Sequence, residues 1–164
     1  MKLGIVSDTH GYVDPRLLLA LAGVDLILHA GDVGGKDVLA ALRDIAPVQG
    51  VYGNNDVKLG GLGLPLVLDL EAAGRRIRIV HELKDRGVLD GVDVLVFGHS
   101  HQQVCETRAG VLWLNPGAAG RQGFHALQTL ALLTIDDDCA ISVEQVPLGP
   151  RLKLPRRTAT GRMP

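Results

Sequence analysis

The stretch Leu3-Gly4-Ile5-Val6-Ser7-Asp8 decides the fold class of this chain. It is a short apolar run closed by Ser7 and Asp8, which is typical of a buried strand. Two similar runs follow, at Asp25–His29 and Val48–Tyr52. Between the runs we predict helices at Pro15–Ala22, with Pro15 at its first position, and at Lys36–Ile45, which has one apolar face. The first part of the chain is therefore predicted to alternate strand and helix.

The second part is richer in strands. An apolar strand is predicted at Val92–Phe97, and three hairpins are predicted around short turns. The hairpin strands are Leu66–Leu70 with Ile77–Val80, Val104–Thr107 with Val111–Leu114, and Leu127–Ile135 with Ala140–Val146. The segment Gly60-Gly61-Leu62-Gly63 is expected to be a flexible connection. Such a mixture favours stacked sheets with helices outside, in one domain over residues 1–146, followed by a basic, proline-containing tail over residues 147–164.

Length and composition restrict the class of protein. The chain has 164 residues, of which 46% are hydrophobic and 21% charged, and this length fits one domain. No apolar run reaches the ~18 residues that a membrane helix requires. The apolar run after Met1-Lys2 is shorter than the h-region of a signal peptide, about 7–15 residues. We therefore expect a cytoplasmic protein with no membrane partner.

The net charge of −1 conceals an asymmetry. Five of the basic residues lie in the last 14 residues, where there is no acid, so the remainder has an excess of acidic over basic residues. A body of that sign does not attract nucleic acid, and the few, scattered aromatic residues do not suggest a surface on which bases stack. Nucleic acid is therefore not an expected partner.

Polar side chains stand where the apolar strands end. These residues are Asp8, His10, Asp32, Asn54, His81, His99 and His101. Ligands collect at the carboxyl ends of strands in α/β sheets. Since residues two apart in an extended segment point to the same side, Asp8 and His10 are predicted to reach one point, and so are His99 and His101.

The residue types agree with a metal site. Carboxylate, imidazole and amide oxygen ligands suit manganese, iron, zinc, cobalt or nickel. The absence of thiolates from the set argues against a structural zinc cluster. The alternative is that these residues are polar caps on loops that never meet.

The ordered motifs resemble a known family. Ser7-Asp8-Thr9-His10, Gly31-Asp32, Gly53-Asn54-Asn55-Asp56, His81 and Gly98-His99-Ser100-His101 resemble those of the calcineurin-like metallophosphoesterase superfamily, and in particular its small, single-domain prokaryotic phosphodiesterases. Leu114-Asn115-Pro116-Gly117 also resembles a loop of that branch. The resemblance runs from Met1 to about Gly120. It implies an α/β (α+β) fold, a four-layer αββα sandwich of two mixed sheets flanked by helices.

The same resemblance implies a two-metal centre that hydrolyses phosphate esters. One divalent ion would be held by Asp8, His10, Asp32 and His101, and the other by Asp32, Asn54, His81 and His99. Manganese is the expected metal, with iron, zinc, nickel, cobalt or magnesium as alternatives. A hydroxide bridging the ions would attack a small phosphate ester, most readily a diester.

Two positions depart from the family pattern. Many members have histidine where this chain has Asn55, which can donate a hydrogen bond to a substrate phosphate but cannot deliver a proton. We therefore expect diesters with aryl-type leaving groups to react far better than alkyl ones. Glu82 follows His81, where glycine is common in the family, and it either orients a ligand or faces solvent.

Other residues have less defined roles. His29 is expected to be a hydrogen-bonded structural residue, and Asp56 is expected to tie its loop together rather than bind metal. His125 lies in a loop from which it could approach substrate. Leu62 and Leu64 could supply an exposed apolar contact for a homo-oligomer. The alternative function is a non-catalytic protein-binding scaffold of the same fold, like the small retromer subunit.

Overall fold

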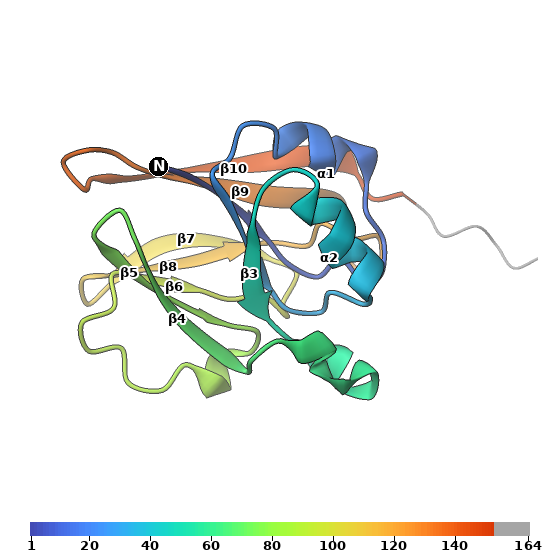
Figure 1. Cartoon of the computed structure of the whole chain (residues 1–164), viewed down its shortest axis with the longest axis horizontal. Coiled ribbons are helices and arrows are strands. Elements are labelled where there is room, and N and C mark those ends of the chain that lie inside the picture. Colours follow the sequence, from blue (N-terminus) through green and yellow to red (C-terminus); the bar gives the residue numbers. More distant parts are fainter. Residues whose placement is uncertain (153–164) are drawn as a thin grey trace, which may run out of the picture.

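The apolar run after Met1 forms the central strand of a five-stranded sheet in the computed structural model, which describes residues 1–152 (Figure 1). The strand order is β10-β9-β1-β2-β3. Strands β1, β2 and β3 are parallel, whereas β9 is antiparallel to both β1 and β10. The bounds are β1 Lys2–Val6, β2 Leu26–Ala30, β3 Val48–Val51, β9 Leu127–Ile135 and β10 Ile141–Pro150.

The second sheet has the order β4-β5-β6-β8-β7. Hairpins join β4 to β5 and β7 to β8, while β6 pairs in parallel with both β5 and β8. The predicted hairpins are confirmed, and the parallel centre makes the sheet mixed, as the family resemblance implied. The bounds are β4 Val67–Ala72, β5 Arg75–Val80, β6 Val94–Val96, β7 Gln103–Arg108 and β8 Val111–Pro116.

Strand β1 is buried on both faces because it faces the other sheet on one side and helices on the other. Leu3 and Ile5 lie in the core between the sheets, together with Ile77 and Ile79 of β5. Each such side chain contributes about 1.5–3 kcal/mol when fully buried. Val6 belongs to the core on the opposite face. A strand buried in this way has a continuous apolar sequence, as seen here.

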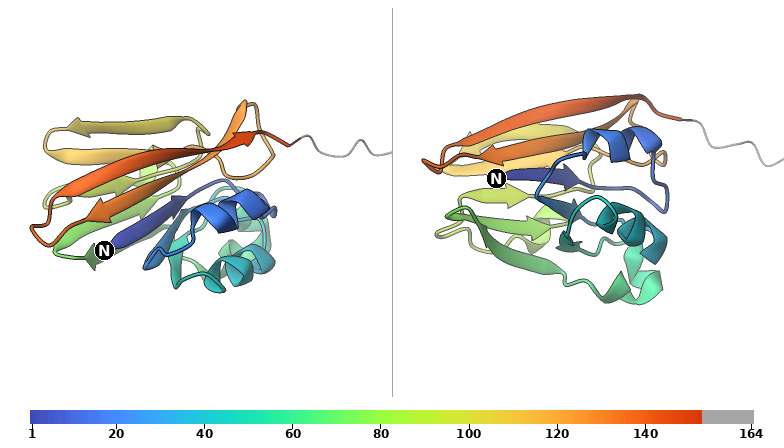
Figure 2. Two further views of the ribbon diagram at one scale, coloured as in Figure 1. Left: turned by 90° about the horizontal axis from the view of Figure 1, so that it is seen from above. Right: turned by 45° about the horizontal axis from the view of Figure 1, so that its top comes forward.

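Helices α1 (Pro15–Ala20) and α2 (Lys36–Arg43) cover the outer face of the first sheet (Figure 2). Helix α1 begins where predicted, because the Asp14 side chain accepts a hydrogen bond from the backbone N–H of Arg16 at 2.9 Å and Pro15 takes the first position. Leu17 of α1 and Leu42 of α2 are fully buried in this second core. The fold class, α+β with two mixed sheets, is confirmed.

The other outer face has little helix. Residues 81–93, all of them described, contain a single 3₁₀ turn, η2 (Leu83–Asp85). A separate cluster packs there, with Phe97 and Trp113 edge to face at 6.1 Å between ring centroids. The second sheet is therefore covered on its outer side by a loop with one 3₁₀ turn and by aromatic side chains. The helix that the expected αββα sandwich would place there is missing from residues 81–93.

Several predicted boundaries shift. The expected flexible connection lies within η1 (Asp56–Gly63), two 3₁₀ turns that meet at a kink. Leu62 and Leu64 pack against the helix-side core instead of standing fully exposed. Residues 147–150, expected in the tail, belong to β10, and residues 153–164 lie outside the described part of the chain.

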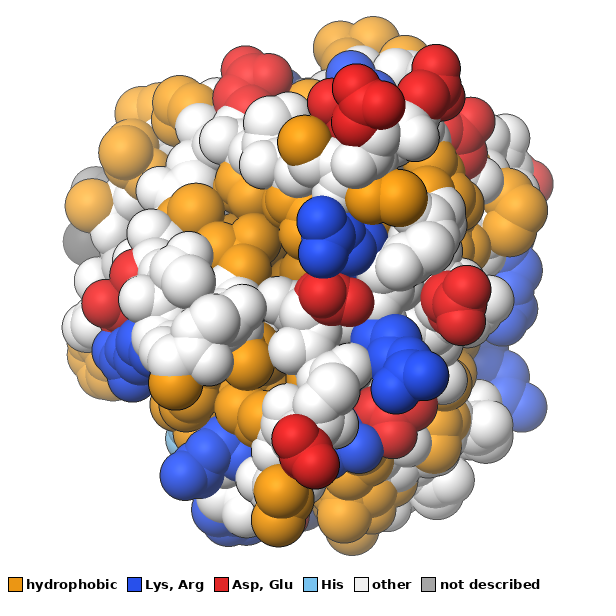
Figure 3. All heavy atoms as spheres, turned by 90° about the vertical axis from the view of Figure 1, so that its left-hand side faces the viewer, with side chains coloured by type: hydrophobic (Ala, Val, Ile, Leu, Met, Phe, Trp, Pro, Cys, Tyr) orange, Lys and Arg blue, Asp and Glu red, His pale blue; other side chains and the backbone are white. Residues whose placement is uncertain are grey.

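The two ends of the sandwich differ in character. Figure 3 shows the end at which β1 begins, where acidic and basic side chains surround exposed hydrophobic ones. The strand-end residues that the sequence singled out lie at the other end of β1. Within residues 1–152 no helix combines the length and apolarity needed to span a bilayer.

His29 is the structural histidine that the sequence predicted. It is fully buried at the end of β2, where its Nδ1 accepts the backbone N–H of Gly31 at 3.2 Å. Its Nε2 lies 3.0 Å from Oγ1 of Thr9, and this hydroxyl donates to the carbonyl of Val33. Burial lowers the pKa of His29 to about 4, so the ring is neutral.

The pKa of His29 predicts a loss of stability on acidification. In the unfolded chain His29 has its ordinary pKa of 6.5 and is protonated below that pH, whereas in the native state it stays neutral until the pH falls to about 4. The contribution of neutral, buried His29 to the free energy of unfolding is therefore fully present above pH 6.5. It falls by about 3 kcal/mol as the pH approaches 4. The free energy of unfolding of wild type and of His29→Leu can be measured by urea unfolding at several pH values in this window. Plotted against pH, the wild-type value should fall more steeply toward low pH than the value for His29→Leu. Parallel curves would contradict the assignment.

Candidate metal centre

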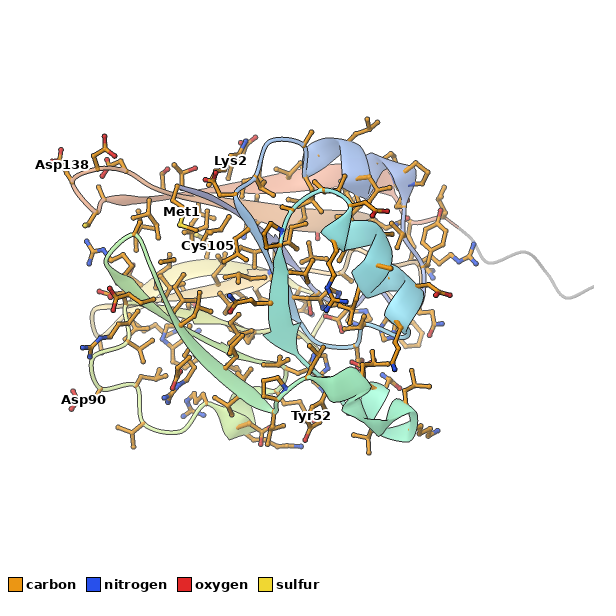
Figure 4. The ribbon with its side chains drawn as sticks, viewed as in Figure 1. Met1, Lys2, Tyr52, Asp90, Cys105 and Asp138 are labelled. Atoms are coloured by element: carbon orange, nitrogen blue, oxygen red, sulfur yellow. The ribbon has the colours of Figure 1, made fainter. Side chains whose placement is uncertain are left out.

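All seven strand-end residues gather at one end of the sandwich. Asp8 and His10 follow β1, Asp32 follows β2 and Asn54 follows β3, while His81 follows β5 and His99 and His101 follow β6. Tyr52, labelled in Figure 4, marks the point where β3 ends and the segment carrying Asn54 begins. The site therefore lies where the carboxyl ends of parallel strands from both sheets meet.

A first group consists of Asp8, His10 and His101, whose ligand atoms lie within 4.8 Å of one another. Oδ1 of Asp8 is 3.1 Å from Nε2 of His101 and 3.8 Å from Nε2 of His10. The two imidazole nitrogens are 3.3 Å apart. Asp8 is fully buried, so the two imidazole nitrogens lie close to a buried carboxylate oxygen.

A second group surrounds His81. Its Nε2 lies 3.5 Å from Oδ2 of Asp32 and 3.1 Å from Oδ1 of Asn54, and Nδ1 of His99 lies 3.2 Å from the same amide oxygen. Oδ2 of Asp32 is also 3.9 Å from Nε2 of His10. Asp32 thus lies near both groups, and so does Asp8, which has a carboxylate oxygen within 4.8 Å of ligand atoms of Asp32 and His81.

The two histidines of the Gly98-His99-Ser100-His101 segment separate, contrary to the prediction that they reach one point. His101 joins Asp8 and His10, whereas His99 joins Asn54. Asp8 and His10 do meet, but not as alternate residues of an extended strand. Their φ angles are +55° and +50°, in the left-handed region. The prediction assumed extended backbone, and the turns after the strands set the directions instead.

Backbone strain is concentrated at this site. Five of the seven residues have positive φ, namely Asp8, His10, Asp32, His99 and His101. Such angles are uncommon for residues other than glycine, and each costs on the order of 1–3 kcal/mol. The surrounding hydrogen bonds must therefore hold these residues in place.

Asp56 provides one such support. Its buried carboxylate accepts backbone N–H groups from Val33 at 3.0 Å, Gly34 at 2.8 Å and Gly53 at 2.9 Å. It joins the loop that carries Asp32 to the loop that carries Asn54, which confirms the predicted structural role of Asp56.

Asn55 acts on Asp32 from the same loop. Its backbone N–H donates to Oδ1 of Asp32 at 2.9 Å, and its side-chain amide donates to Oδ2 at 2.5 Å. One amide hydrogen remains, because the NH₂ group carries two. The contact between Asn55 and a substrate phosphate stays a prediction.

Two glycines allow the close approach of backbone to these side chains. A Cβ atom on Gly53 would lie 2.1 Å from Oδ1 of Asp32, and one on Gly98 would lie 2.0 Å from Oγ of Ser7. Any larger residue at either position would displace a strand end that carries the site.

The electrostatics favour an ionised carboxylate at the centre. Burial opposes ionisation of Asp32, but hydrogen bonds from His81 and Asn55 outweigh it and hold the pKa of Asp32 well below its usual range. Burial lowers the pKa of His10. Burial also acts to lower the pKa of His81, but the hydrogen bond to Asp32 and the charge of Asp8 outweigh it, so that pKa is raised.

Some supporting residues were not singled out from the sequence. Ser7 donates to Oδ2 of Asp8 at 2.6 Å, and the backbone N–H of His99 donates to the same oxygen at 3.1 Å. Asn115 donates to the carbonyl of Gly98 at 2.9 Å and so supports the loop that carries both histidines. The resemblance of residues 114–117 to a family loop was the available signal for Asn115.

Two other candidates take defined places. The carboxylate of Glu82 forms an ion pair with the exposed ammonium group of Lys84, with 2.9 Å between Oε2 and Nζ. Glu82 is therefore directed toward Lys84 at the surface. His125 is half-buried and contacts His101, with 3.2 Å between their Nδ1 atoms. Burial lowers the pKa of His125.

The donor atoms fit divalent cations. Oδ1 of Asp8 is buried and receives no hydrogen bond from residues 1–152, and a buried carboxylate oxygen without a partner is strongly unfavourable. A cation among Asp8, His10 and His101 would compensate for it. Oxygen and imidazole donors suit transition-metal dications.

Comparisons with known proteins agree with this geometry. The profile of the calcineurin-like phosphoesterase superfamily domain matches residues 1–138. A probable metallophosphoesterase of Methanocaldococcus jannaschii is 35% identical over 134 residues, which are 72% of this chain and 68% of that protein.

Solved structures share the fold. A novel archaeal phosphodiesterase superposes with a TM-score of 0.74 at 23% identity, covering 89% of this chain and 100% of the other. Wild-type Vps29 of Entamoeba histolytica, complexed with Zn²⁺, superposes with a TM-score of 0.67 at 22% identity, covering 91% of this chain and 100% of the other. With the family profile matched over most of its length, the chain belongs to the calcineurin-like phosphoesterase superfamily.

Proposed function

We propose that this chain is a divalent-metal-dependent phosphodiesterase of the cytoplasm. The observation that carries the proposal is the buried, unpartnered Oδ1 of Asp8 beside two imidazoles, next to a second group joined through Asp32. Two divalent cations at such a site supply the charge that activates water near neutral pH and neutralises phosphate oxygens. We propose manganese as the metal in the cell.

The proposed ligand sets follow the two groups of side chains. Asp8, His10, Asp32 and His101 would hold the first ion, and Asp32, Asn54, His81 and His99 would hold the second. The strained loops, held by Asp56 and Asn55, keep these donors in position before any ion arrives. Such preorganisation lowers the reorganisation required on binding.

Water is the proposed nucleophile, because neither nearby serine has a base available. The hydroxyl of Ser7 donates to Asp8, a proposed ligand, at 2.6 Å. Oγ of Ser100 accepts from the side-chain amide of Asn115 at 3.1 Å. The neighbouring imidazoles are proposed metal ligands, so a serine nucleophile would lack the free base that activates it.

Two clefts meet at the His99–Ser100 segment, which suits an ester with two substituents. One has a volume of about 300 Å³ and is lined by Phe97, Val104 and Trp113. The other, of about 370 Å³, is lined by Gln102, Phe124 and His125. A phosphodiester has one group for each cleft, whereas a monoester has only one. We propose that the first cleft takes an aromatic substituent, since aromatic rings line it.

A scaffold of the same fold is the second candidate. Vps29 of Entamoeba histolytica has been crystallised with Zn²⁺, so metal binding does not by itself distinguish the two functions for this chain. Turnover does. The proposal therefore requires hydrolysis that depends on metal and on the ligands.

Removing the central carboxylate should abolish hydrolysis. Asp32→Asn takes away the negative charge shared by both groups, and the rate on bis(p-nitrophenyl) phosphate with added Mn²⁺ should fall by more than about 100-fold, beyond the effect of an outer-shell change. Asp137→Asn, an equal charge change in the exposed β9–β10 turn, should leave the rate unchanged. Chelator should suppress wild type. Unaltered turnover in folded Asp32→Asn, or none in metal-loaded wild type, would refute the proposal.

The leaving group should control the rate. Since Asn55 cannot protonate a departing oxygen, methyl phosphodiesters of weakly acidic alcohols should react about 10²–10⁴-fold more slowly than those of nitrophenols. A plot of log kcat/KM against leaving-group pKa should slope steeply downward. A flat plot would show that another group donates the proton.

Trp113 should contribute to the choice of substrate. Trp113→Ala should lower the preference for bis(p-nitrophenyl) phosphate over methyl p-nitrophenyl phosphate by about 2–10-fold, the worth of one aromatic contact. Trp113→Phe should retain most of the preference. An unchanged ratio in the alanine variant would place the aromatic group elsewhere.

A further inference from the structure

His125 stands behind His101, on the side away from Asp8. Its Nδ1 is 3.2 Å from Nδ1 of His101, and its Nε2 is 3.0 Å from the carbonyl oxygen of Gly120. The two rings meet edge to face, with centroids 5.1 Å apart. The contact depends on Gly123, because a Cβ there would lie 2.3 Å from Nδ1 of His101.

The positions of the hydrogens follow from these contacts. A carbonyl oxygen only accepts, so Nε2 of His125 carries the hydrogen that it shares with Gly120. In the neutral ring Nδ1 of His125 is then an acceptor, and the hydrogen between the two rings belongs to Nδ1 of His101. That leaves Nε2 of His101 with a free lone pair, directed at the volume it shares with Asp8 and His10.

The loop that supplies His125 is tied to the same strand end as Asp8. The backbone N–H of Gly120 donates to the carbonyl of Asp8 at 3.0 Å, and that of Ala119 donates to the carbonyl of Ser7 at 2.9 Å. The acceptor that holds His125 is therefore fixed to the segment that carries a proposed ligand. His125 and Asp8 approach His101 from opposite sides of its ring, and both positions are set by one short loop.

We infer that His125 is a positioning residue that fixes the Nδ1–H tautomer of His101 and so presents Nε2 to the first metal ion. The inference rests on the proposed function, because it assigns His101 to that ion. A hydrogen bond to the far nitrogen of a metal-binding imidazole sets ring orientation and tautomer, and its loss typically weakens metal binding 10–100-fold. In this role His125 acts on the metal only through His101.

Metal affinity gives the first test. Calorimetric titration with Mn²⁺ of full-length wild type, His125→Leu and His125→Asn should show a dissociation constant raised about 10–100-fold by leucine. Asparagine places an amide oxygen near the position of Nδ1, so it should restore most of the affinity. Gln122→Ala, an exposed neighbour in the same loop, should match wild type. Thermal unfolding of each variant checks that it is folded.

The outcomes separate this inference from the proposed function. If wild type binds no metal, both fall. If wild type binds metal and folded His125→Leu binds it within about twofold, only the role of His125 is overturned. If asparagine is as weak as leucine, the effect comes from packing rather than from the acceptor, and the inference fails as well.

The tautomer can be observed directly. In protein loaded with diamagnetic Zn²⁺, whose charge lies between Nε2 and the Asp8 carboxylate, long-range ¹H–¹⁵N spectra should show His101 of wild type with its hydrogen on Nδ1. His125→Leu should show a mixture, which a merely structural role would not produce. A dominant Nε2–H tautomer in wild type would overturn the inference even if the affinities changed as expected.

Discussion

The buried carboxylate of Asp8 is the interaction on which the site depends, because it joins the two sheets and remains incompletely satisfied. One oxygen accepts the hydroxyl of Ser7 and the backbone N–H of His99, which follows a strand of the other sheet. The second oxygen has no hydrogen-bond donor among residues 1–152. The first oxygen therefore fixes the geometry, and the second is a buried acceptor beside two imidazoles, as the proposed metal site requires.

The strain around Asp8 requires support from residues that do not themselves bind metal. Asp56 collects three backbone N–H groups from two loops, and Asn55 holds both oxygens of Asp32. Left-handed angles at five of the proposed ligands would be unfavourable in an isolated loop. They persist because two packed sheets determine where each strand ends, so part of the stability gained by core burial offsets the strain of an organised site.

The outer faces of the two sheets are covered in different ways, and this difference shapes the surface beside the site. Helices α1 and α2 cover the first sheet, whereas a loop and aromatic side chains cover the second. That difference leaves a cleft lined by Phe97 and Trp113 beside His99.

Apolar periodicity and residue chemistry are local signals, and from them the sequence predicted stacked sheets with helices outside, the strands that end in polar residues and the structural roles of His29 and Asp56. That both sheets are mixed was implied only by the family resemblance. The family motifs marked Asp8, His10, Asp32, Asn54, His81, His99 and His101 as candidates. The family resemblance assigned His99 and His101 to different ions, whereas strand periodicity had placed them at one point, and the structure agrees with the former. Only the tertiary structure directed the amide of Asn55 to Asp32 and placed His125 behind His101. These contacts join residues from different loops, and left-handed backbone angles that no local pattern specifies set their directions.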